Sequence, residues 1–211
     1  MYNKLKIFIA DDHSVVRSGM SRLLKTFKRV AEVQEASNGK ELIQLIEKEQ
    51  PDAVILDVEM PVMGGLDAAR YLLDHFPRVK ILVLTMHTED VFISRLVDLG
   101  VHGFLSKTSE PEEVEQALYA IVDKDFYRND LVDKALLHLK KQAPSPSLEK
   151  LSHRETEVLV LICQEYTPGE ISARLIISEK TFSNHRSSII AKTGVRNNIG
   201  LYKYALQHGY F

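Results

Sequence analysis

The stretch AVILDVEMP at residues 53–61 decides the fold of this chain. It begins with a continuous apolar run that ends at Asp57, and such a run is typical of a strand buried on both faces of a parallel sheet. Pro61 and the pair Gly64–Gly65 follow, which predicts a tight turn at a place where side chains would crowd anything bound at Asp57. We therefore expect Asp57 to stand at the carboxyl end of a buried strand.

Working outward from this stretch, short apolar runs alternate with amphipathic helical patterns, which predicts an α/β doubly wound domain with five parallel strands. In such a domain the functional groups gather at the carboxyl ends of the strands. The predicted strands are Lys6–Ala10, Val33–Ala36, Ala53–Asp57, Lys80–Thr85 and Gly103–Leu105. The predicted helices are Ser14–Phe27, Gly39–Glu49, Gly65–His75, Asp90–Leu99 and Pro111–Asp123.

Composition excludes several classes of protein. The 211 residues are 45% hydrophobic and 27% charged, which is typical of a globular protein rather than a disordered or fibrous one. No apolar run has the length of a membrane span, and the apolar residues near the N-terminus are interpreted as a strand rather than a signal peptide. A single cysteine, Cys163, excludes an intrachain disulfide and suits a reducing compartment. We expect a cytoplasmic protein with no membrane partner.

The second half of the chain differs from the first. Acidic side chains outnumber basic ones in residues 1–147, and the reverse holds for residues 148–211, although the whole chain carries a net charge of −2. Residues 126–141 read as a helical connector, and Pro144 and Pro146 among serines predict an extended linker. We predict a first domain at residues 1–124, a connector and linker at 125–150, and a small all-α domain at 151–211.

Polar side chains end four of the predicted strands. Asp11 and Asp12 follow the first strand and Asp57 ends the third, so three carboxylates should converge on one cleft. A cluster of carboxylates requires a cation, and oxygen ligands favour Mg²⁺. Thr85 adds a hydroxyl and Lys107 an ammonium, and together these groups suit phosphoryl transfer to a carboxylate.

These residues resemble the receiver domain of response regulators, which has a flavodoxin-like fold. The motifs are DD at 11–12, DVEMP at 57–61, Thr85, and GFLSK at 103–107. The resemblance implies that Asp57 accepts phosphate from a sensor histidine kinase. It also implies that Mg²⁺ is held by Asp11, Asp12, Asp57 and the backbone carbonyl of Glu59.

The same resemblance assigns switch residues. Lys107 would pair with the phosphoryl oxygens, Thr85 would move to hydrogen-bond them, and Phe104 would rotate inward as the threonine moves. Glu59 and His87 flank the pocket at positions that tune phosphate lifetime in the family. Both are equally consistent with solvated loop residues.

The last 61 residues carry the signature of a helix-turn-helix domain. Ser152 with Glu155 and Thr167 with Glu170 form predicted capping boxes, and Ser178 is a predicted N-cap for a third helix. The motifs LSHRETEVL, EISARLIISEKTFSNHRSSIIAK and TGVRN resemble the LuxR-type output domain of the NarL/FixJ subfamily. That resemblance makes Glu179–Lys192 the recognition helix for double-stranded DNA. The predicted DNA-binding residues are Lys180, Thr181, Ser183, Asn184, Arg186, Ser187 and Lys192.

Three positions depart from the pattern of that family. Gly169, Ser183 and Ser187 stand where basic residues are common, so fewer phosphate contacts and weaker binding by a monomer are expected. We therefore predict that useful affinity requires a homodimer on a two-fold repeated site. The resemblance implies that residues of the last helix supply part of the dimer contact; alternatively they complete the small core, and some do both. They are Ile199, Leu201, Tyr202, Tyr204 and Ala205.

The sequence thus predicts a two-component response regulator in which phosphorylation of Asp57 switches conformation or dimerisation, and thereby sequence-specific DNA binding. RNA polymerase is a further candidate partner. We expect no enzymatic activity beyond self-catalysed transfer to Asp57 and hydrolysis from it. One alternative is a phosphohydrolase of the haloacid dehalogenase type, although Asp11-Asp12-His13 lacks the D-x-D motif of that class. Others are a constitutive transcription factor with a vestigial receiver, and a helical domain that docks on protein.

Overall fold

The computed structural model describes residues 4–87, 89–139 and 150–211. The chain divides into two compact units, Met1–Thr88 with Val101–Val122, and Glu89–Gly100 with Asp123–Phe211. The predicted linker with Pro144 and Pro146 lies outside the described residues. The helix at Asp90–Leu99 groups with the second unit, although we assigned it to the first predicted domain. The predicted domain boundaries stay a prediction, because a compact unit is defined differently from a sequence domain.

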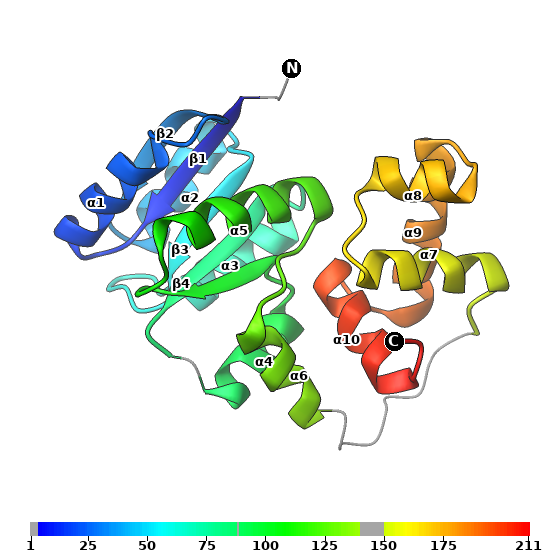
Figure 1. Cartoon of the computed structure of the whole chain (residues 1–211). Helices are drawn as coiled ribbons and strands as arrows, with labels where there is room; N and C mark the ends of the chain where they lie inside the picture. Colours follow the sequence, from blue (N-terminus) through cyan, green and yellow to red (C-terminus); the bar gives the residue numbers. More distant parts are fainter. Residues whose placement is uncertain (1–3, 88, 140–149) are drawn as a thin grey trace. The chain divides into compact units, whose positions relative to one another are not determined.

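The first unit is built on a five-stranded parallel sheet (Figure 1). Its strands are β1 (Leu5–Ala10), β2 (Val30–Ala36), β3 (Ala53–Asp57), β4 (Lys80–Thr85) and β5 (Gly103–Ser106), in the order β2-β1-β3-β4-β5. This sheet confirms the predicted α/β doubly wound fold. Because β1 and β3 are neighbours, the segments that follow Ala10 and Leu56 emerge side by side.

Burial explains which strands the sequence marks clearly. All five residues of β3 are buried, as are five of the six in β4, so both appear in the sequence as continuous apolar runs. The edge strand β2 is only partly buried and contains polar residues. It begins at Val30, three residues earlier than predicted, because Leu5 of β1 pairs with Val30.

Helices cover both faces of the sheet in the first unit (Figure 1). They are α1 (Ser14–Leu24), α2 (Gly39–Lys48), α3 (Gly65–His75) and α5 (Pro111–Lys124). Asn38 caps α2 by accepting the backbone N–H of Glu41 at 3.0 Å. The helix α1 ends three residues before the predicted Phe27, where the hydroxyl of Thr26 donates to the carbonyl of Leu23 at 2.7 Å. That hydrogen bond satisfies one of the carbonyls left free at the helix end.

The second unit contains helices and connecting loops, but no strand, among its described residues. It holds α4 (Asp90–Leu99), α6 (Asp130–Leu139), α7 (His153–Cys163), α8 (Pro168–Leu175), α9 (Glu179–Thr193) and α10 (Asn198–His208). The helix α6 begins four residues after the predicted Phe126, because Asn129 caps it by accepting the N–H of Val132 at 3.1 Å. No helix among the described residues is long and apolar enough to cross a membrane.

The elements α8 and α9 form the predicted helix-turn-helix. Both predicted capping boxes are present, at Ser152 with Glu155 and at Thr167 with Glu170. Ile176 has a left-handed backbone with φ of 55° and reverses the chain between the two helices. Ser178 then caps α9 by accepting the N–H of Thr181 at 3.0 Å. A small apolar core holds the helices together, and its members include Val158, Leu159, Ile162, Ile171, Phe182 and Ile189.

Candidate functional site

The carboxyl edge of the sheet gathers the acidic residues that the sequence singled out. Asp11 follows β1 and Asp57 ends β3, and their exposed fractions are only 2% and 3%. The ammonium of Lys107, from the turn after β5, lies 2.9 Å from Asp11 Oδ2 and 2.7 Å from Asp57 Oδ2. The structure therefore brings the two strand-end carboxylates and the predicted lysine into one buried contact.

Backbone hydrogen bonds fix the segments that carry these groups. The backbone N–H of His13 donates to Asp11 Oδ1 at 2.8 Å, and the guanidinium of Arg17 donates to the carbonyl of Asp11 at 2.6 Å. The N–H of Lys107 donates to the carbonyl of Thr85 at 3.0 Å, which places its side chain beside the cleft. Sequence reasoning missed Arg17, and no spacing signal distinguishes it from an ordinary surface arginine of α1.

The charges in the cleft are held out of water. Burial raises the pKa of Asp57, although the ammonium of Lys107 acts in the opposite direction. Burial also opposes the charge on Lys107, but hydrogen bonds to Asp57 and Asp11 outweigh it and raise the pKa of the lysine. The ammonium is therefore retained as a fixed cation at neutral pH.

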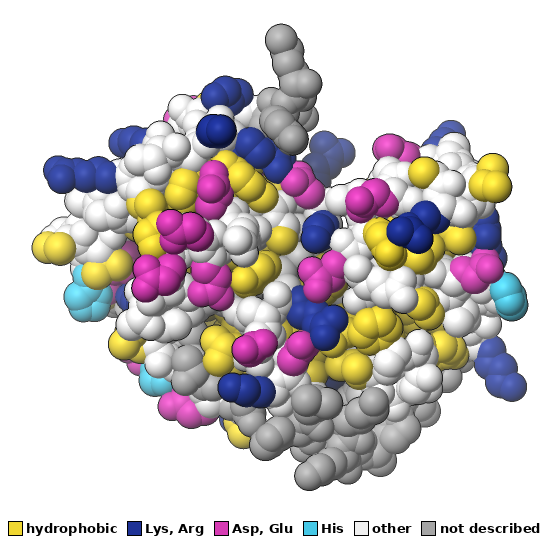
Figure 2. Space-filling model, in the orientation of Figure 1, with side chains coloured by type: hydrophobic (Ala, Val, Ile, Leu, Met, Phe, Trp, Pro, Cys, Tyr) yellow, Lys and Arg dark blue, Asp and Glu magenta, His cyan; other side chains and the backbone are white. Residues whose placement is uncertain are grey.

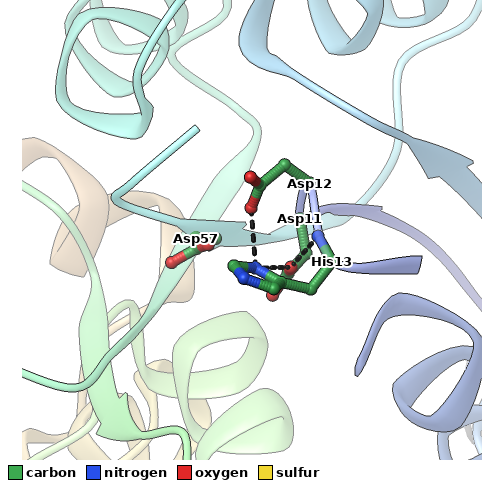
Figure 3. Close-up of side chains that lie close together, drawn as sticks. All are labelled: Asp11, Asp12, His13 and Asp57. Carbon is green, nitrogen blue, oxygen red and sulfur yellow. Dashed lines mark hydrogen bonds and ion pairs between the residues drawn. The ribbon is translucent and has the colours of Figure 1, made fainter. Parts of the chain in front are cut away.

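The donor set fits a divalent cation. Figure 3 shows Asp11, Asp12 and His13 grouped closely after β1, with Asp57 at the end of the neighbouring strand β3. One ligand atom from each lies within 4.8 Å of those of the other three. Lys107 balances one of the three carboxylates, so a net negative charge remains around the buried Asp11 and Asp57. A hard cation with oxygen ligands, such as Mg²⁺, would neutralise it.

The remaining predicted residues of the cleft lie close by. Thr85 is 1% exposed, and its hydroxyl oxygen accepts the backbone N–H of His87 at 2.9 Å. Phe104 is fully buried in β5, opposite Val83 of β4. At the mouth of the cleft, His87 Nε2 lies 2.9 Å from Glu59 Oε1. Both side chains remain substantially exposed, so they form a surface pair next to Asp57.

Most of the predicted DNA-contacting residues are exposed on α9, the predicted recognition helix. Its exposed residues include Lys180, Ser183, Asn184 and Ser187, and Thr181 is half-buried near the capping Ser178. On the opposite side Phe182 and Ile189 are buried, whereas Ile177 and Ile190 are only partly buried. Arg186 and Lys192 instead lie in ion pairs with acidic groups of the same unit.

Two family models match the chain in the order that these sites suggest. Residues 7–119 match the response regulator receiver domain, and residues 149–205 match the bacterial regulatory proteins of the LuxR family. The chain belongs to the NarL/FixJ response regulators. It combines a receiver domain with a LuxR-type DNA-binding domain, and proteins of this family are transcription regulators rather than classical enzymes.

Named relatives align with almost the whole length of this chain. The chain is 31% identical over 207 residues to the response regulator GacA of Pseudomonas aeruginosa, covering 97% of each protein. It is 30% identical to the response regulator UvrY of Escherichia coli, covering 97% of this chain and 95% of UvrY. A solved complex of the response regulator RcsB with DNA is 30% identical, with a TM-score of 0.60 over 97% of this chain and 99% of that one.

In this response regulator, Lys192 of the recognition helix has a structural partner. Its ammonium lies 2.8 Å from Oε2 of Glu155, a residue of α7 that is only 4% exposed. Glu155 also accepts hydrogen bonds from the Ser188 hydroxyl at 2.6 Å and the Ser152 N–H at 2.7 Å. The sequence identified Glu155 as a capping residue, but its buried network depends on tertiary packing between α7 and α9.

This network should make the output domain sensitive to acid. Burial alone would raise the pKa of Glu155, but hydrogen bonds from Lys192, Ser188 and Ser152 lower it from 4.5 to about 2. The charged carboxylate therefore stabilises the folded state above pH 4.5, and that contribution is lost as the pH falls towards 2. We expect Glu155→Gln to reduce the free energy of unfolding by about 1–3 kcal/mol at neutral pH.

The comparison is made by urea unfolding of both proteins at several pH values. The difference between the wild type and Glu155→Gln should shrink steadily below pH 4.5, because the carboxylate of the unfolded wild type is protonated there while that of the folded protein stays charged until about pH 2. The control is Glu179→Gln, an exposed acidic residue at the start of α9. A difference that stays constant down to pH 3 would contradict the assigned role of the Glu155 charge.

Arg186, the other basic residue with a partner, is held at the start of the connector. Its guanidinium forms an ion pair with Asp125 and donates through Nε to Asn198 Oδ1 at 2.8 Å. Asn198 in turn donates through its side-chain amide to the carbonyl of Lys124 at 2.8 Å. Asp125 has a left-handed backbone with φ of 70°, so it marks a sharp turn between α5 and α6. The sequence contains no signal that would have revealed this partner of Arg186.

Proposed function

We propose that Asp57 accepts a phosphoryl group from a sensor histidine kinase and that this modification controls sequence-specific DNA binding by α9. The observation that carries the proposal is the ammonium of Lys107 in contact with both Asp11 and Asp57 in a buried cleft beside Thr85. A fixed cation next to the acceptor carboxylate is what a developing phosphoryl charge requires.

The chemistry is an in-line displacement at phosphorus. A carboxylate oxygen of Asp57 forms the new P–O bond, and the P–N bond to the donor imidazole breaks, leaving its electron pair on nitrogen. Asp11, Asp12, Asp57 and the backbone carbonyl of Glu59 would hold Mg²⁺, which supplies neutralisation of the phosphoryl charge. Lys107 binds a phosphoryl oxygen, since its ammonium already lies against Asp57.

The response begins at Thr85 and Phe104. The Thr85 hydroxyl accepts a hydrogen bond from His87, and its own hydrogen is the donor that a phosphoryl oxygen can attract. Movement of Thr85 changes the packing around Phe104, which is fully buried on the neighbouring strand. Phosphorylation thereby shifts an equilibrium that exists beforehand between an inactive and an active arrangement.

In the second unit, the last helix, α10, is buried against neighbouring helices that include α6. Tyr202 of α10 donates its hydroxyl to Asp133 of α6 at 3.1 Å, and the guanidinium of Arg128 lies 4.8 Å from its ring centroid. The predicted dimer residues of α10 are all buried, including Ile199 and Leu201. We infer that activation by dimerisation through this helix requires a rearrangement of the helices that pack on it, α6 among them, which gives the connector a part in the switch.

The exposed residues of α9 are the proposed DNA contacts. Asn184 suits bidentate recognition of adenine, and Lys180 suits a phosphate. RcsB, to which the chain is similar, has been solved as two dimers bound to two parallel DNAs. Arg186 and Lys192 become available for DNA only when their acidic partners, Asp125 and Glu155, release them. The complete set of proposed contacts is Lys180, Thr181, Ser183, Asn184, Arg186, Ser187 and Lys192. RNA polymerase is proposed as a further partner of the DNA-bound form.

The experiment that tests the whole proposal compares the full chain with and without beryllofluoride, which mimics the phosphoryl group. With Mg²⁺ present, beryllofluoride should increase both the apparent mass in solution and the affinity for target DNA. If the apparent mass and the DNA affinity are the same with and without beryllofluoride, the proposed switch is wrong. Rapid multiple turnover of a small phosphate ester, in place of one phosphoryl group per chain, would favour the phosphohydrolase alternative.

The sparse basic charge on α9 leads to a prediction about stoichiometry. A DNA duplex with one half-site should bind weakly, and a duplex with a two-fold repeat should bind the phosphorylated protein cooperatively as a dimer. We expect the affinities to differ by about a hundredfold or more, because linkage multiplies weak contacts. Gel-shift titrations of the two duplexes make the measurement. A tight one-to-one complex on the single half-site would contradict the prediction.

The ion pair between Arg186 and Asp125 leads to a second prediction about DNA. Asp125 occupies the guanidinium that a DNA phosphate would bind, so Asp125→Asn should raise the DNA affinity of the unphosphorylated chain by roughly threefold to tenfold. Asparagine tolerates a left-handed backbone, so the turn should survive the change. The slope of log affinity against log salt should steepen by about one phosphate contact.

Two further variants isolate this effect. Asp130→Asn removes the same charge from an exposed position at the start of α6 and should leave the affinity unchanged. In the double variant with Arg186→Ala, the gain from Asp125→Asn should disappear. A gain that persists without Arg186 would show that Asp125 acts in some other way.

A further inference from the structure

The acidic cleft contains one group that the phosphoryl-transfer proposal does not use, the imidazole of His13. Nδ1 of His13 lies 2.8 Å from Asp12 Oδ1 and 3.4 Å from Asp11 Oδ1. Although His13 is the residue that precedes α1, its side chain makes no capping hydrogen bond to that helix. Figure 3 shows the ring turned towards the carboxylates rather than away from them.

The position of the ring changes the metal chemistry of the cleft. Magnesium prefers oxygen ligands and retains water, so it gains little from a nitrogen donor. Zinc-class cations bind imidazole well and favour four ligands in a compact tetrahedral arrangement. One ligand atom each from Asp11, Asp12, His13 and Asp57 already lies within 4.8 Å of the others, so the chain supplies four ligands of the kinds that such cations accept.

A second observation supports occupation by a cation. Oδ2 of Asp11, Oδ2 of Asp57 and Oδ1 of Asp12 are shielded from solvent and find no hydrogen-bond donor among the described residues beyond the contacts of Lys107 and His13. Asp11 and Asp57 are both more than nine-tenths buried. Asp11 and Asp57 share the single ammonium of Lys107, and Asp12 faces only the imidazole of His13, so the cluster keeps an excess of negative charge that a metal ion would stabilise.

We propose that His13 makes this cleft a binding site for zinc-class divalent cations, with the imidazole as the fourth ligand beside Asp11, Asp12 and Asp57. Four ligands from the protein close the coordination shell, which leaves no position for a phosphoryl oxygen. A bound cation of this class therefore competes with magnesium and keeps Asp57 unphosphorylated. The inhibitory part rests on the proposed phosphorylation of Asp57, whereas the binding part stands without it.

The binding part is tested on the full chain by equilibrium dialysis against Zn²⁺, and separately against Mg²⁺, with no phosphodonor present. His13→Asn should weaken Zn²⁺ binding by about tenfold or more while changing the Mg²⁺ affinity far less. His13→Cys should restore the preference for Zn²⁺, because a thiolate is also a good zinc ligand. His153→Asn, which alters a histidine whose side chain is 91% exposed on α7, controls for adventitious binding to surface imidazoles.

The visible spectrum of Co²⁺ gives an independent readout. The wild-type complex should show the intense bands of four-coordinate cobalt, and His13→Asn should lose them. Equal Zn²⁺ affinity in the wild type and His13→Asn would overturn the proposal, as would a parallel loss of Zn²⁺ and Mg²⁺ affinity. If Zn²⁺ binds through His13 but phosphorylation in Mg²⁺ is never observed, the proposed function fails and the metal site stands. If phosphorylation proceeds undiminished at saturating Zn²⁺, the inhibitory part fails alone.

Discussion

Asp57→Asn is expected to lose phosphoryl incorporation from acetyl phosphate or a histidine kinase by at least about a hundredfold, because the amide has no anionic oxygen to attack phosphorus. The wild-type chain should take up one phosphoryl group, in a bond that is labile to base. The measurement is labelling of the full chain in Mg²⁺, followed by peptide mapping. The change in DNA affinity produced by the phosphodonor should vanish in the same variant.

The matched control is Asp67→Asn, which removes an exposed carboxylate near the start of α3. This variant should be labelled like the wild type, since Asp67 lies outside the cleft and pairs only with Arg70 in the described structure. Labelling of Asp57→Asn at the wild-type level would place the acceptor elsewhere, and the account of the switch would have to be abandoned. Labelling of the variant at Asp11 or Asp12 would keep the cleft but change its acceptor.

Gly65→Ala should be the most damaging single substitution outside the cleft itself. A Cβ at this position would lie 1.9 Å from the backbone oxygen of Asp57 and 2.8 Å from the Cα of Val58. Both neighbours are backbone atoms, so rotation of a side chain cannot relieve the overlap. We expect a loss of about 3 kcal/mol or more in the free energy of unfolding, or a displacement of Asp57 that abolishes phosphorylation.

The preceding residue provides a close control. A Cβ at Gly64 would meet its nearest neighbour, the Val58 oxygen, at 3.5 Å, which is an ordinary van der Waals contact. Gly64 has φ of −70° and ψ of 161°, a conformation that alanine adopts without strain. Gly64→Ala should therefore change stability by less than about 1 kcal/mol. Urea unfolding and labelling of the two variants should separate them clearly, and similar behaviour would contradict the close approach at Gly65.

The strands that were predicted best are those that are buried on both faces of the sheet. The bounds of β3 and β4 match the prediction because central strands are buried on both faces, and their apolar runs end where the polar cleft begins. The edge strand β2 was predicted too short, since most of its residues are exposed or only partly buried and it lacks a continuous apolar run. The start of α6 was also misplaced, because the capping role of Asn129 lies in a side-chain hydrogen bond rather than in hydrophobic spacing.

The sequence by itself determined the sheet, the helix-turn-helix and the residues that end the strands, because these follow from local patterns of polarity and capping. Only the tertiary structure decided which charges meet. Lys192 with Glu155, Arg186 with Asp125, and His13 with the acidic cleft are all pairings of this kind. An ion pair depends on where two segments lie after folding, and no property of either residue in isolation specifies its partner.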